Sequence, residues 1–97
     1  MINLTAKQYD NFTLIEIEID GGICEPSDLK NLGYPLVNFQ KGVIISGRAP
    51  VWVFATIVHE FHPALWVATF DPRLGGGIVV QSHSKDYQIG DIIPLLH

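Results

Sequence analysis

The stretch Phe12-Thr13-Leu14-Ile15-Glu16-Ile17-Glu18-Ile19-Asp20 decides the fold class of this chain. Isoleucine occupies every second position from 15 to 19, and glutamate fills the two positions between. A period of two with β-branched residues is typical of a strand that is buried on one face only. The pair Gly21-Gly22 follows directly, so we expect the strand to end there.

The rest of the chain predicts two helices and further strands. We expect a short helix that Ser27 caps and that Gly33 and Pro35 end, and a longer one from Pro50 to about Phe61. Apolar segments predict strands at residues 42–46, 65–70 and 77–81, and an edge strand within 87–95. This order predicts one domain over residues 1–97, an α+β fold with a small ferredoxin-like sheet and two helices packed on it.

The amino-acid composition argues against several classes of function. The chain has 97 residues, of which 47% are hydrophobic and 16% are charged, enough apolar material for a core. The net charge of −4 argues against duplex DNA as a partner and favours a small ligand in a focused site. No apolar run approaches the roughly 20 residues that span a bilayer, and no signal peptide opens the chain. We therefore expect a cytoplasmic protein that does not enter a membrane.

Ser46-Gly47-Arg48 lies between a predicted buried strand and a helix start. Unpaired backbone N–H groups and the helix dipole favour an anion at such a position, and the arginine fork matches phosphate. Gly47 would let a ligand approach the backbone closely. An ordinary strand-to-helix turn with a solvated arginine explains the same residues equally well.

Further polar residues follow elements later in the chain. His62 comes after the longer helix, Asp71 and Arg73 lie in a glycine-backed hairpin, and Ser82 and His83 end the next strand. Each has a plain alternative as a helix-end histidine, a turn opener or a polar loop. From these residues alone, the sequence predicts an α+β domain with an anion site.

Three blocks taken together are more specific than their parts. Gly42-Val43-Ile44-Ile45-Ser46-Gly47-Arg48-Ala49-Pro50-Val51-Trp52, Asp71-Pro72-Arg73-Leu74-Gly75 and Val79-Val80-Gln81-Ser82-His83-Ser84 closely resemble the third CRISPR-associated ring nuclease family. The resemblance implies a ferredoxin-like fold, a homodimer, and cleavage of the second messenger cyclic tetra-adenylate in type III CRISPR defence. It also implies a manganese-dependent exonuclease acting on 3′ adenylates, and two dimers that sandwich the cyclic ligand.

Carried over by position, the resemblance implies His62 and Asp71 as the catalytic pair. Either side chain is a candidate base, or both would hold Mn²⁺. The implied ligand-binding residues are Ser46, Gly47, Arg48, Arg73, Ser82 and His83. The partners would be cyclic tetra-adenylate or a short RNA and further copies of the chain, in a homodimer that assembles further with ligand.

The strand expected between His62 and Asp71 would span roughly 20 Å. The two side chains would then meet across an interface between molecules. A module that binds a cyclic oligoadenylate without cutting it is the alternative function.

Overall fold

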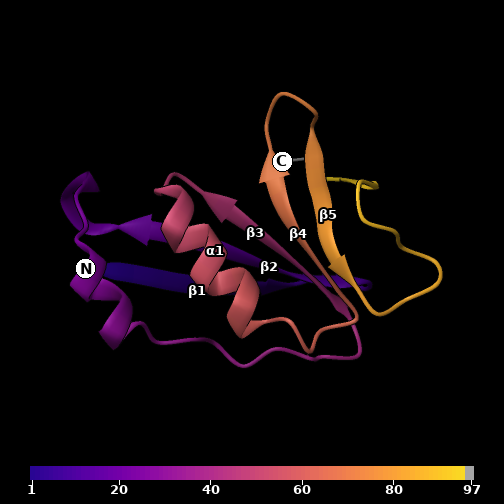
Figure 1. Ribbon diagram of the computed structural model, residues 1–97, viewed down its shortest axis with the longest axis horizontal. Helices are drawn as coiled ribbons and strands as arrows, with labels where there is room; N and C mark the ends of the chain where they lie inside the picture. The colour runs from indigo at the N-terminus through magenta and orange to yellow at the C-terminus, as the bar shows by residue number, and fades with distance from the viewer. Residues whose placement is uncertain (96–97) are drawn as a thin grey trace.

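The computed structural model describes residues 1–95 and folds them into one six-stranded sheet crossed by a single α-helix (Figure 1). The strands are β1 (Ile2–Gln8), β2 (Phe12–Ile19), β3 (Gly42–Gly47), β4 (Trp66–Asp71), β5 (Gly76–Ser82) and β6 (Ile92–Pro94). The helix α1 (Val51–Glu60) connects β3 to β4, and two short 3-10 helices, η1 (Asp20–Gly22) and η2 (Pro26–Asn31), follow β2.

The strands lie side by side in the order in which they occur in the chain. The central strands β2, β3 and β4 run parallel, and β1, β5 and β6 are antiparallel to their neighbours. In a split βαβ unit of a ferredoxin-like fold, another strand separates the parallel strands, whereas here they are direct neighbours. The α+β class is therefore confirmed, and the ferredoxin-like arrangement is not.

Apolar residues cover both faces of the central strands. On one face, Ile45 of β3 belongs to a core that includes Val53 and Ile57 of α1. On the other face, Ile44 and Trp66 pack with the C-terminal segment, which contributes the residues Tyr87, Ile93 and Leu95. Burial on both faces explains why β3 has a continuous apolar sequence instead of an alternating one.

Two sequence expectations are corrected at the N-terminal half. β1 was not expected, yet it pairs with β2 along its full length from Ile2 to Gln8. The helix expected after Ser27 is the 3-10 helix η2, and its cap residue is Glu25, whose backbone N–H donates to the Asp28 carboxylate. A single short 3-10 helix replaces the second packed helix of the prediction.

The prediction for the remaining elements is confirmed within a few residues. Pro50 is the residue before α1 and not its first turn, and the edge strand expected within 87–95 is β6. The hairpin between β4 and β5 is present, with its turn at residues 72–75. None of the helices formed by residues 1–95 combines the length and the apolar character that a membrane span requires.

Candidate functional site

The carboxyl ends of β3 and β4 lie at the same edge of the sheet because the two strands are parallel neighbours. β3 ends in the half-buried Ser46 and the exposed Gly47, and the exposed Arg48 follows, three residues before the start of α1. β4 ends in Asp71, at the base of the turn to β5. Ligands of open sheets with parallel strands commonly bind outside these carboxyl ends, so this edge is the first candidate for an anion site.

The fold itself requires glycine at position 47, independently of any ligand. Its φ angle is 137°, and an added Cβ would lie 2.6 Å from the carbonyl oxygen of Ile17 in β2. The close approach of β2 therefore requires glycine here. This contact explains Gly47 without the ligand approach that the sequence suggested.

Asp71 and Arg73 form a local ion pair in the β4–β5 turn. The Asp71 carboxylate accepts a hydrogen bond from the Arg73 backbone N–H at 2.8 Å and lies 3.3 Å from the guanidinium Nη2. These hydrogen bonds hold the pKa of the Asp71 carboxyl below its usual value. Asp71 is therefore ionised at neutral pH, which suits an electrostatic or positioning role better than that of a general base.

His62 lies beyond the other end of β4, past the C-terminus of α1. Its Nδ1 is 3.1 Å from the carbonyl oxygen of His59, and the two imidazole rings stack with centroids 5.8 Å apart. A carbonyl oxygen only accepts hydrogen bonds, so in the neutral ring this contact favours the tautomer with the proton on Nδ1. In that tautomer the Nε2 atom of the exposed His62 is the acceptor that a general base requires.

His83 and Gln81 hold the backbone at His62. The Nε2 atoms of Gln81 and His83 lie 2.8 Å and 2.9 Å from the His62 carbonyl oxygen. The structure thus brings His62 and His83 together, as well as His59 and Gln81, which were not among the expected site residues. The His-x-x-His spacing at the helix end and the Gln-x-His of the next strand are the patterns that indicate them.

Ser82 uses its hydroxyl within the chain. The hydroxyl donates to the Tyr87 carbonyl and accepts from the Ser84 backbone N–H. These contacts fold the segment after β5 back over the sheet. They give Ser82 a structural role, separate from the ligand-binding role that the resemblance implied.

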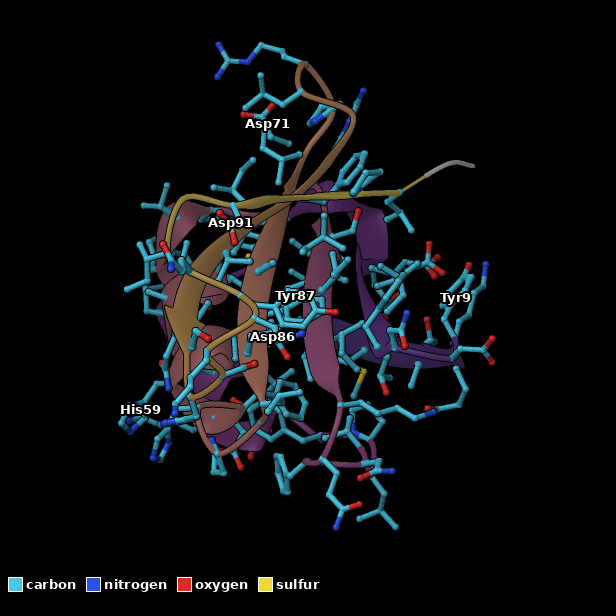
Figure 2. All side chains as sticks on the ribbon, turned by 90° about the vertical axis from the view of Figure 1, so that its right-hand side faces the viewer. Tyr9, His59, Asp71, Asp86, Tyr87 and Asp91 are labelled. Carbon is cyan, nitrogen blue, oxygen red and sulfur yellow. The ribbon has the colours of Figure 1, made fainter. Side chains whose placement is uncertain are left out.

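The two members of the expected catalytic pair lie at opposite ends of β4. Figure 2 shows Asp71 near the top of the view, and His59, the stacking partner of His62, far below it at the lower left. Within residues 1–95, moreover, no three His, Cys, Asp or Glu side chains gather closely enough to hold a metal ion. One chain therefore does not fit a manganese ion shared by His62 and Asp71.

Comparison with known sequences identifies the family of this chain. Residues 17–94 match the profile of the family described as CRISPR-associated protein (Cas_csx3). The chain belongs to this Cas_csx3 family. It is also 40% identical over 91 residues to an uncharacterized protein of Aquifex aeolicus (strain VF5), covering 90% of this chain and 81% of the relative. The CRISPR association expected from the three sequence blocks is confirmed.

The family match spans most of the described fold. It begins within β2 and ends at the last residue of β6, so it contains both ends of β4 and all eight residues that the resemblance assigned to the site. The Cas_csx3 domain therefore carries the histidine end and the Asp71–Arg73 turn in one unit.

Proposed function

We propose that this Cas_csx3 chain is a ring nuclease that cleaves cyclic tetra-adenylate in type III CRISPR defence. The observation that carries the proposal is the position of two complementary groups at opposite ends of β4. One end presents the free Nε2 of His62, and the other presents an ionised carboxylate with an exposed arginine. Two molecules that meet end to end would bring these groups together.

In this arrangement His62, Asp71 and the two arginines have separate chemical roles. His62 Nε2 takes the proton from the nucleophile, the adjacent ribose 2′-OH or a water, as its oxygen forms a bond to phosphorus. The bond from phosphorus to the leaving ribose oxygen breaks, and that oxygen takes up a proton from the imidazolium or from water. Asp71 of the facing molecule stabilises the imidazolium that forms, because its pKa is held low and it stays charged. Arg73, together with Arg48 on the same edge of the sheet, neutralises the phosphate as charge develops in the transition state.

The assembly belongs to the same proposal. A homodimer that associates further on the ligand would place a histidine end against an Asp71 end. A head-to-tail contact of this kind uses different surfaces on the two molecules. Sedimentation with and without cyclic tetra-adenylate measures it, and a monomer under both conditions would contradict it.

A direct assay tests whether cleavage requires a metal ion. Radiolabelled cyclic tetra-adenylate is incubated with the protein with and without Mn²⁺, and 3′-adenylated linear RNA serves as the second substrate. We expect cleavage of the ring to linear product. Binding of the ring with no product under either condition would instead favour the non-catalytic sensor module.

A further inference from the structure

A cavity of about 260 Å³ lies between α1 and β4, close to the Asp71–Arg73 turn. Val51 and Phe54 line it from α1, and Thr69 and Phe70 line it from β4. Thr69 and Asp71 are two residues apart in β4 and so lie on the same face of the sheet. The cavity therefore lies beside the end of β4 that carries the Asp71–Arg73 turn.

The lining of this cavity suits a flat heteroaromatic ring. Phe54 is half-buried and offers an aromatic surface, Thr69 adds a hydroxyl, and Val51 is 84% exposed at the rim. Single-stranded nucleic acids are recognised mainly by stacking bases on aromatic side chains, with hydrogen bonds to the base edges. Pockets for drug-sized ligands measure about 300–1,000 Å³, so this smaller cavity fits one base and not a whole nucleotide.

The positive charge of Arg73 beside the cavity indicates which group of the ligand is attached to the base. The Arg73 side chain is 88% exposed, and its contact with Asp71 is an exposed ion pair that contributes little to folding. Such a guanidinium is available to a phosphate. A base in the cavity and a phosphate at Arg73 together describe a nucleotide of an RNA chain.

A second cavity, next to the residues that lead into α1, has different chemistry. It measures about 400 Å³ and is lined by Arg48 with small and aliphatic residues, and no aromatic side chain lines it. Its own cation makes it suitable for a phosphate. Of the two cavities, the one at Phe54 therefore has the lining for base recognition.

We propose that the cavity between α1 and β4 binds an adenine base of the oligoadenylate ligand, stacked on Phe54, with the attached phosphate at Arg73. This inference rests on the proposed function and adds where one base of the ligand is held. It makes Val51, Phe54 and Thr69 binding residues, none of which the sequence indicated.

The first test fills the cavity mouth without disturbing the core. Val51→Glu places a carboxylate at an exposed position in the first turn of α1, where a negative charge is favourable to the helix. Leu36→Glu is the matched control, because Leu36 is 95% exposed and does not line the cavity. Both are made in the His62→Ala background, so that cleavage does not consume the ligand, and thermal melting confirms that each is folded.

We expect Val51→Glu to weaken the affinity for cyclic tetra-adenylate at least tenfold, and Leu36→Glu to leave it within about twofold of the parent. Equal affinities of the two variants would overturn the proposal. If the wild-type protein binds the ring without cleaving it, the proposed function fails while the base site stands. If the wild-type protein does not bind the ring, both fail.

A second measurement reports on the base directly and needs no variant. In an NMR titration, adenosine 5′-monophosphate should shift the backbone amides of Val51 and Thr69. Ribose 5-phosphate, which lacks the base, should shift the turn at residues 72–75 and leave those two amides unchanged. Identical shifts from the two probes would show that the base does not enter the cavity, and would overturn the proposal.

Discussion

At the scale of single residues, Asp71 is the group whose protonation the structure determines most directly. Arg73 donates to it through both its backbone and its side chain, and this lowers the pKa of the carboxyl. The ion pair stabilises the folded turn above the usual aspartate pKa. That contribution is lost as the pH falls through the lowered folded-state pKa.

Removing the arginine side chain should therefore change the titration of Asp71. In Arg73→Ala we expect the midpoint of the Asp71 carboxyl to move upward, toward its usual value, in a ¹³C NMR titration. Lys85→Ala, which removes a cation elsewhere on the surface, is the control and should not move it. An unchanged midpoint in Arg73→Ala would contradict the assignment of the ion pair.

A substitution at Gly47 tests whether the fold requires glycine in the turn before α1. Gly47→Ala puts a Cβ at positive φ against the Ile17 carbonyl oxygen, which should lower the free energy of unfolding by about 1–3 kcal/mol. Gly33→Ala is the matched control, because no atom lies within 4 Å of the added Cβ and no positive φ is required. Chemical denaturation measures both, and equal stability of the two variants would rule out the close contact with β2.

The sequence located the ends of elements better than it described the contacts made there. It predicted that Asp71 and Arg73 share a tight turn, since residues two apart in a hairpin are necessarily close. The contacts of Gln81 and His83 with the His62 carbonyl join residues that are 19 and 21 positions apart in the chain, respectively. No local pattern specifies such a contact, so only the folded sheet brings these residues together.

At the scale of elements, local patterns predicted the segments that carry a strong period. β2, β3, α1 and the β4–β5 hairpin were expected because alternation, a buried run and turn residues mark them. The prediction missed β1, although Ile2, Leu4 and Ala6 alternate with polar residues in the same way. Its pairing with β2 buries Ile2 and leaves Lys7 to pair with Glu16 at 3.2 Å.

The packing of α1 on the sheet predicts a large effect of one substitution. Ile57 is fully buried between α1 and the strands, so Ile57→Ala should lower the free energy of unfolding by about 2–5 kcal/mol. Ile89→Ala deletes the same atoms from a side chain that is 73% exposed, and should change it by less than about 0.5 kcal/mol. Similar losses in urea denaturation would show that α1 does not pack as described.

At the scale of the whole molecule, the length of β4 separates the two halves of the proposed site, and the order of strands sets which strand ends share an edge of the sheet. Local patterns do not determine whether β2, β3 and β4 become direct neighbours or are separated by other strands, which is why the ferredoxin-like arrangement was not confirmed. The separation of His62 from Asp71 was predictable, because one uninterrupted strand joins them. What the fold adds is that each end is exposed and can contact another molecule.

The mixing of two inactive variants tests the central claim that catalysis needs two molecules. His62→Ala and Asp71→Ala should each lower the rate of cyclic tetra-adenylate cleavage by on the order of 10²-fold or more, with little change in affinity for the ring. When the two variants are mixed in equal amounts, about one contact in four joins an intact His62 to an intact Asp71, if the molecules pair at random. We therefore predict that the mixture recovers a clear part of the wild-type rate. Full activity of either variant alone, or a mixture that stays inactive while sedimentation shows the two variants in contact, would contradict the account.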